Sequence, residues 1–296
     1  MEYTLEDIEK IKSEGFLLSL EQNILDIITK LSQEVSSPEY TITPQFKKHS
    51  DKWLRDKPVK KKITKNDFEV CVDNIRTSLN KITKQTYETQ LNVIVTNIKT
   101  ILASDYSKLD NLELINGIIY NIVSSNNFYS ELYAKLYKEL IIKYNFIDYY
   151  FNNKLSLINE NISNIDYCDP NEDYDKFCDI NKKNEKRRSL ILFYVNLMKL
   201  DIININNISN LRVYIQEKIK ENISLDNKIS IVDELANILH MLITNYFTKN
   251  LTEFDKITSY LNEIISLNKS KYPSLSNKAK FKYMDIIDFM NKSNKD

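Results

Sequence analysis

The chain has 296 residues, enough for one large domain or two smaller ones. Its 41 basic residues balance 41 acidic ones, so it has no global charge that would attract nucleic acid or a membrane surface. Glycine occurs only at Gly15 and Gly117, fewer positions than a parallel α/β enzyme with phosphate-binding loops needs. Cys71, Cys168 and Cys178 are too few and too scattered for a disulfide framework.

The sequence offers no nucleophile–base pair, no phosphate-binding loop and no set of metal ligands, so we expect a protein that is no enzyme and takes no cofactor. No apolar run approaches the roughly 20 residues that a membrane span requires. The N-terminal stretch MEYTLEDIEK is acidic and lacks the basic region that opens a signal peptide. We therefore expect a cytoplasmic protein without membrane contacts.

Residues 1–35 have the pattern of a helical arm, with Gly15 as a break.

Residues 36–65 contain three of the five prolines and no helical period, which indicates a linker. Between residues 46 and 65 the linker carries nine basic residues against two acidic ones. It is either a solvated tether or an RNA-binding segment, in which basic side chains contact phosphates and an aromatic ring stacks on bases. The candidate RNA contacts are Lys47, Lys48, Lys52, Trp53, Arg55, Lys60, Lys61 and Lys62.

Residues 66–291 show a steady helical period, and the spacing of Thr64 to Asp67 predicts a capping box before the first helix. The predicted helices follow one another so that each antiparallel pair, with its connections, takes about 46 residues. This repeat length is typical of HEAT repeats. We therefore predict an all-α HEAT-repeat (ARM-type) α-solenoid of about five helical pairs. The polar stretch 163–186 is expected to form a long loop. The predicted helices lie near 66–82, 85–102, 110–124, 128–142, 145–163, 184–200, 208–221, 226–247, 250–267 and 275–291.

The stretch IRTSLNKITKQTYETQL resembles the first helical pair of the middle domain of eukaryotic translation initiation factor 4 gamma, the scaffold of the cap-binding complex. That family carries the pattern Leu-Asn-Lys-Leu-Thr-Pro-x-x-Phe, which residues 79–83 and Tyr87 keep, with Lys84 at the proline position. Four later stretches resemble further helices of the same domain in the same order. They are LINGIIYNIV, FYSELYAKLYKEL, LFYVNLMKL and SNKAKFKYMDIIDF.

In the arm, KSEGFLLSLEQ resembles the motif Tyr-x-x-x-x-Leu-Φ, through which the same scaffold holds a cap-binding protein. Phe16, Leu17 and Leu18 fit this motif, and Lys12 stands at its tyrosine position. Tyr3 starts a rival register, in which Glu9 occupies the apolar position.

The resemblance implies a translation initiation scaffold with three partners. A cap-binding protein of the initiation factor 4E type would contact Phe16, Leu17 and Leu18, and mRNA would contact the linker. A DEAD-box RNA helicase of the initiation factor 4A type would contact Leu79, Ile82 and Tyr87, an apolar patch at an uncovered end of the solenoid. From the pattern alone, these last three residues are better explained as core residues of the first repeat, since apolar stripes usually pack inward, and only the resemblance favours partner contact.

Two alternatives to this function stay open at the level of sequence. The first is a HEAT-repeat adaptor in mRNA processing or decay, and the second is a generic structural repeat protein. Binding of a cap-binding protein would favour initiation over both. The heavy use of Asn, Ile, Lys and Tyr is typical of an AT-rich genome, and a compact, divergent scaffold suggests a viral protein from a large DNA virus or a protein of a reduced protist.

Overall fold

A computed structural model describes residues 4–14, 20–35, 66–247 and 253–295. The chain divides into two units, residues 1–63 and 64–296, and each is described by itself. All regular elements in the described ranges are helices, which confirms the predicted all-α class. None of these helices combines the length and the hydropathy that a membrane span needs.

The first unit contributes two described helices, α1 (Leu5–Glu14) and α2 (Gln22–Val35). Apolar residues of α2 recur at the spacing of one helical face, at Ile24, Ile27, Ile28 and Leu31. These four side chains are nevertheless between 41 and 59% exposed. Helix α2 is therefore an amphipathic helix whose apolar face is not buried by the described part of the chain.

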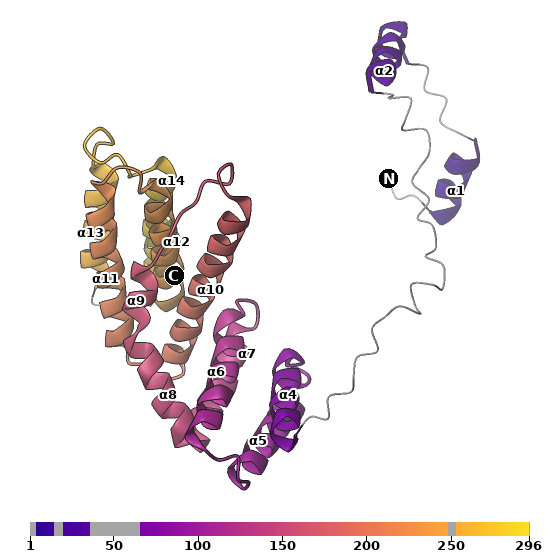
Figure 1. Cartoon of the computed structure of the whole chain (residues 1–296). Helices are drawn as coiled ribbons and strands as arrows, with labels where there is room; N and C mark the ends of the chain where they lie inside the picture. Colours follow the sequence, from indigo (N-terminus) through magenta and orange to yellow (C-terminus); the bar gives the residue numbers. More distant parts are fainter. Residues whose placement is uncertain (1–3, 15–19, 36–65, 248–252, 296) are drawn as a thin grey trace. The chain divides into compact units, whose positions relative to one another are not determined.

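The second unit is a stack of five antiparallel helical pairs in chain order, as predicted (Figure 1). The pairs are α4 (Asp67–Asn80) with α5 (Tyr87–Leu102), α6 (Leu109–Ser125) with α7 (Ser130–Lys143), α8 (Asn145–Ser156) and α9 (Ile158–Ser163) with α10 (Tyr174–Lys199), α11 (Ile205–Ile223) with α12 (Ile229–Tyr246), and α13 (Phe254–Ser266) with α14 (Asn277–Lys295). In the third pair, side-chain contacts join α8 and α9 to α10, among them Phe151 with Tyr194 and Arg187 with Asn161. The second helices α7, α10, α12 and α14 pack against one another in succession.

The capping box that opens the stack lies two residues later than predicted. The Asn66 side chain accepts a hydrogen bond from the Glu69 backbone N–H at 2.8 Å, and the Glu69 carboxylate accepts one from the Asn66 N–H at 3.1 Å. Asparagine caps as well as threonine, and the glutamate three residues later completes the reciprocal pair.

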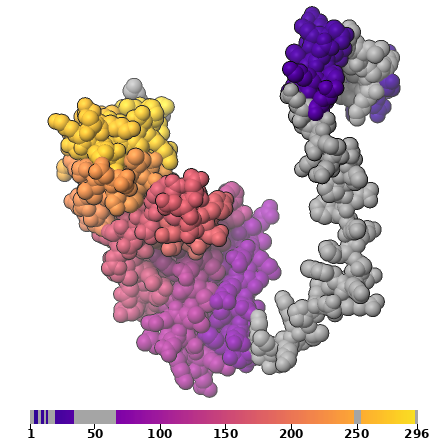
Figure 2. Space-filling view, turned by 45° about the horizontal axis from the view of Figure 1, so that its top comes forward, coloured from indigo at the N-terminus to yellow at the C-terminus, as the bar shows by residue number. Residues whose placement is uncertain are grey.

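The prediction of a long loop over 163–186 is wrong in its second half, because α10 already begins at Tyr174. Asp173 caps this helix by accepting a hydrogen bond from the Lys176 N–H at 2.9 Å. In the first turns of α10, the side chain of Ile180 is buried and that of Phe177 is half-buried, while most of the other side chains are exposed. Two apolar residues three apart give too weak a period to predict a helix. In Figure 2 these turns (red) stand out from the surface of the stack.

A cluster of aromatic rings fills the middle of the stack, where α6, α7, α8 and α10 meet. Tyr120, Tyr137, Phe151, Phe193 and Tyr194 are all buried, and their ring centroids lie 5.6 to 6.5 Å apart in the contacting pairs. The hydroxyls of Tyr120 and Tyr194 share a hydrogen bond of 2.6 Å. Edge-to-face aromatic pairs stabilise a core beyond the area that they bury, so this cluster ties the second pair to the third.

Candidate functional site

The predicted contacts of the arm and the linker lie outside the described residues. This holds for Phe16, Leu17 and Leu18 and for every candidate RNA contact between residues 46 and 65. The helices on either side of the FLL stretch are described: α1 ends at Glu14 before it, and α2, with its exposed apolar face, begins at Gln22 after it.

The expectation that Leu79, Ile82 and Tyr87 form an uncovered patch is wrong. Their exposed fractions are 0, 2 and 4%, and all three belong to the continuous core. The second helical pair covers them: the Tyr133 hydroxyl on α7 donates a hydrogen bond to the Leu79 carbonyl at 2.8 Å. The end of the solenoid that the sequence analysis took for open is therefore closed by α7.

Tyr87 is also held through its hydroxyl, which donates a hydrogen bond to the Glu139 carboxylate on α7 at 2.8 Å. The Lys135 ammonium lies 4.5 Å from the centroid of the Tyr87 ring, close enough for a cation–π contact. Burial, and then the hydrogen bond to Glu139, raises the pKa of the Tyr87 hydroxyl above its ordinary value. Tyr87 is thus a structural residue that joins the first two pairs.

The turn between α4 and α5 is held by hydrogen bonds between two threonines and presents polar side chains outward. The backbone N–H of Thr83 donates to the Thr86 hydroxyl at 2.9 Å, and the Thr86 N–H donates to the Thr83 hydroxyl at 3.2 Å. Lys81, Lys84 and Gln85 are the exposed residues of this turn.

A hollow of about 320 Å³ lies beside this turn, between Lys84, the α6–α7 connection and α10. Its most accessible apolar side chain is Phe128, which is 86% exposed and packs edge-on against Tyr129 at a centroid distance of 4.7 Å. Asn196 on its floor is fixed by a hydrogen bond to the Ser130 hydroxyl at 3.0 Å. An exposed phenylalanine beside a lysine and a hollow is suited to contact with another protein. The sequence analysis missed Phe128 because it treated the residue as the start of a helix.

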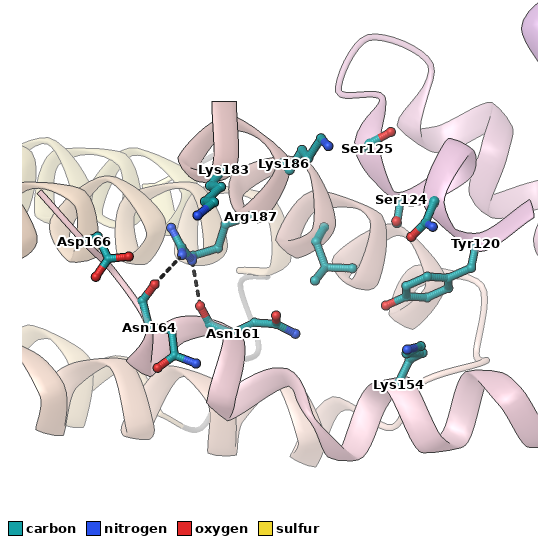
Figure 3. Close-up of a pocket in the computed structure, with 12 residues that line it drawn as sticks. Tyr120, Ser124, Ser125, Lys154, Asn161, Asn164, Asp166, Lys183, Lys186 and Arg187 are labelled. Carbon is teal, nitrogen blue, oxygen red and sulfur yellow. Dashed lines mark hydrogen bonds between the residues drawn. The ribbon is translucent and has the colours of Figure 1, made fainter. Parts of the chain in front are cut away.

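A larger cleft of about 640 Å³ opens between the C-terminal half of α6, helices α8 and α9, and the middle of α10 (Figure 3). Lys183, Lys186 and Arg187 line it from α10, and Lys154 faces them from α8. Asp166 is the one carboxylate among the residues that line this cleft. The sequence analysis placed Lys183 and Lys186 in the expected loop over residues 163–186, and the early start of α10 places them on a helix instead.

Arg187 anchors the wall of this cleft. Its Nε donates to the Asn161 carbonyl at 2.7 Å and its Nη2 to the Asn164 carbonyl at 2.9 Å, so it holds the last turn of α9 and the residue that follows (Figure 3). Its Nη1 donates to the Asn184 side chain. Burial lowers the pKa of Arg187 below its ordinary value, and the nearby carboxylates Glu234 and Asp166 oppose this shift.

Within the ranges that the structure describes, no three His, Cys, Asp or Glu side chains lie close enough to hold a metal ion. No family model matches the chain, and no curated protein matches it at a significant level.

Proposed function

We propose that the chain is a non-enzymatic scaffold of translation initiation that acts in the cytoplasm. It would bridge a cap-binding protein of the initiation factor 4E type, a DEAD-box RNA helicase of the initiation factor 4A type, and mRNA. The solenoid of helical pairs supports this proposal because stacked repeats expose long surfaces for partners. The ordered series of motifs that resemble the middle domain of initiation factor 4 gamma supports it independently.

The observation that carries the proposal is the exposed apolar face of α2, directly after the FLL stretch. Ile24, Ile27 and Leu31 fall at the spacing with which an amphipathic helix enters a groove of its partner. An arm of this kind needs a partner to bury its apolar face, and a cap-binding protein is the partner that the resemblance implies.

Helicase contact is assigned here to exposed residues around the hollow beside the buried stretch 79–87. Lys84 and Phe128 lie on the two turns that border the hollow there, and both are exposed. One aromatic and one cation make a small patch, which suits a contact that opens and closes with each helicase cycle. Such a contact would stimulate the helicase by favouring one arrangement of its two lobes.

The arm is tested by pull-down of an initiation factor 4E-type protein with the full chain. We expect Leu17→Ala with Leu18→Ala to abolish capture, because buried apolar anchors commonly contribute about 2 kcal/mol or more each. The matched control is Leu5→Ala with Leu109→Ala, which removes the same side chains from positions 81 and 72% exposed. Failure of the parent chain to capture any cap-binding protein would contradict the proposal and favour an adaptor of mRNA processing or decay.

The helicase contact is tested by stimulation of the ATPase of an initiation factor 4A-type protein. We expect Phe128→Ala to lose stimulation and to keep the parent melting temperature, because the ring is exposed. Tyr149→Ala, at a 71% exposed position on α8, should retain full stimulation. Full stimulation by Phe128→Ala would remove the helicase from this surface.

A further inference from the structure

We propose that the cleft between α6, α8, α9 and α10 binds a compact, multiply phosphorylated small molecule. This inference does not depend on the scaffold function, because it rests on the charge, size and lining of the cleft alone.

The first argument is the excess of positive over negative charge in the cleft. Four cationic side chains and one carboxylate line the cleft. Among the described residues, Lys183 and Lys186 form no ion pair, and Arg187 hydrogen-bonds to two main-chain carbonyls and an amide instead of a carboxylate. When charges of mostly one sign line a cleft in the low-dielectric protein, their electric field is focused into the cleft. A ligand with several negative charges is what this field selects.

The second argument is that the cationic wall is pre-formed. The Arg187 guanidinium donates hydrogen bonds to the Asn161 and Asn164 carbonyls and to the Asn184 side chain of its own helix. These bonds hold the cationic face of α10 in place against α9. Lys186 and Arg187 lie three and four residues after Lys183, so the three side chains project to the same side of α10. The entropy lost when a ligand orders these side chains is smaller because the charged groups already lie close together before it binds.

The third argument is the neutral lining, which suits phosphate oxygens better than bases or apolar side chains. The side chains of Asn121 and Asn164 add amide groups around the cations. Asn161 and Ser125 line the cleft as well, with their side chains donating to the Leu157 and Ile122 carbonyls. Tyr120 is 7% exposed and its hydroxyl is bonded to Tyr194, so its ring offers no open face on which a base could stack. Proteins that bind single strands combine a basic groove with stacking aromatic rings, and this cleft has no such ring.

Size and polarity exclude an acidic peptide as the preferred occupant. Peptide interfaces depend on apolar anchors that fill pockets, whereas Leu190 is the one aliphatic residue that lines this cleft. The volume of about 640 Å³ falls in the range of pockets for small ligands, roughly 300–1,000 Å³. Phosphate groups take charge-assisted hydrogen bonds from lysine, arginine and amide donors at once.

The test is isothermal titration calorimetry of the full chain with two probes, inorganic tripolyphosphate and inositol hexakisphosphate, at physiological salt. We expect a single saturable site for at least one probe. Lys183→Gln with Lys186→Gln should weaken it by about tenfold or more, because each lost charge-assisted bond weakens binding severalfold. All the mutated side chains are exposed, so the fold should persist, which the circular-dichroism melting curve checks.

The matched control is Lys176→Gln with Lys182→Gln, which removes the same charge from exposed positions of the same helix that do not line the cleft. Its affinity should equal that of the parent. Equal weakening by both pairs would show general attraction to a basic helix and would overturn the proposal, as would the absence of saturable binding in the parent. Binding of an oligouridylate strand or a polyglutamate peptide that needs Lys183 and Lys186, when neither phosphate probe binds, would also overturn it and assign the cleft to RNA or to protein.

Discussion

At the scale of single residues, Tyr137 shows how tyrosine substitutes for a purely apolar residue in this core. The side chain is fully buried, and its ring packs against Tyr120, Phe151 and Phe193. Its hydroxyl finds no hydrogen-bond partner in the part of the chain that the structure describes. A buried polar group without a partner opposes folding by the cost of removing it from water.

We therefore expect Tyr137→Phe to be neutral or to stabilise the protein by about 1 kcal/mol, measured by chemical denaturation. The control is Tyr133→Phe, which keeps the ring but removes the hydrogen bond to the Leu79 carbonyl. That variant should lose about 1 kcal/mol. A destabilised Tyr137→Phe would show that the hydroxyl is satisfied in solution.

A second prediction at the scale of single residues concerns the stability that Leu79 contributes to the core. Because its side chain is fully buried, Leu79→Ala should lower the free energy of unfolding by about 2–5 kcal/mol and lower the melting temperature sharply. Leu109→Ala, at a position 72% exposed, should melt close to the parent. A Leu79→Ala variant that melts like the parent would restore the idea of an uncovered patch at this place.

At the scale of elements, α10 links the middle of the stack to its C-terminal half. Arg188 on α10 donates to both carboxylate oxygens of Glu234 on α12, at 2.8 and 2.6 Å. The Glu234 side chain is 8% exposed and that of Arg188 is 32% exposed. Burial raises the pKa of Glu234, and the charge of Arg188 opposes this shift. The pair therefore offsets the cost of burying a carboxylate between two helices.

Replacing Arg188 alone should leave the buried Glu234 carboxylate without its partner, so the cost of burying that carboxylate should appear as a loss of stability. We expect Arg188→Met to destabilise the protein by roughly 3 kcal/mol, whereas Arg188→Met with Glu234→Leu should recover most of this loss. In the single variant the folded-state pKa of Glu234 rises further above its unfolded value, because burial is no longer opposed by the charge of Arg188. Ionising Glu234 then costs more in the folded chain than in the unfolded chain, so the single variant's deficit against the parent grows as pH rises above the unfolded pKa of about 4.3. Urea denaturation at several pH values measures both effects, and equal stabilities of the single and double variants would contradict the account.

The same element marks the limit of what sequence could predict. Most of the helices from α4 to α14 were predicted because their apolar residues recur with the helical period over several turns. The start of α10 was not, since two apolar residues and a capping aspartate are too few for a pattern. The burial of Leu79 depends on which neighbouring helix covers it, which is a tertiary fact absent from periodicity. The cleft combines side chains such as Tyr120, Lys154 and Arg187 from separate helices, and no local pattern unites them.

At the scale of the whole molecule, the charge distribution separates the two proposed anion contacts. The linker carries nine basic residues between positions 46 and 65, outside the described ranges, whereas the cleft belongs to the helical stack. Extended nucleic acid and a compact phosphate ligand would thus be bound by different parts of one chain, although its total charge is balanced.

Deleting residues 46–65 should therefore weaken the binding of single-stranded RNA, most strongly at low salt. With several phosphates contacted, the logarithm of the parent's binding constant should fall by several units per unit logarithm of salt concentration. Replacing the nine basic residues by glutamine tests charge at constant length and should reproduce the loss. A flat salt dependence in fluorescence anisotropy, or equal binding by the deletion variant, would remove RNA from the linker.

The stacking of helical pairs in chain order has a consequence for how the chain acquires its structure. Each pair packs mainly on the pair before it and the pair after it, so contacting residues are close in sequence throughout the stack. Folds rich in local contacts close short loops first and fold fast, and stacked repeats can begin at any unit and spread to the next. On a ribosome, α4 and α5 could associate as soon as both have emerged, and each later pair would find a finished surface on which to dock.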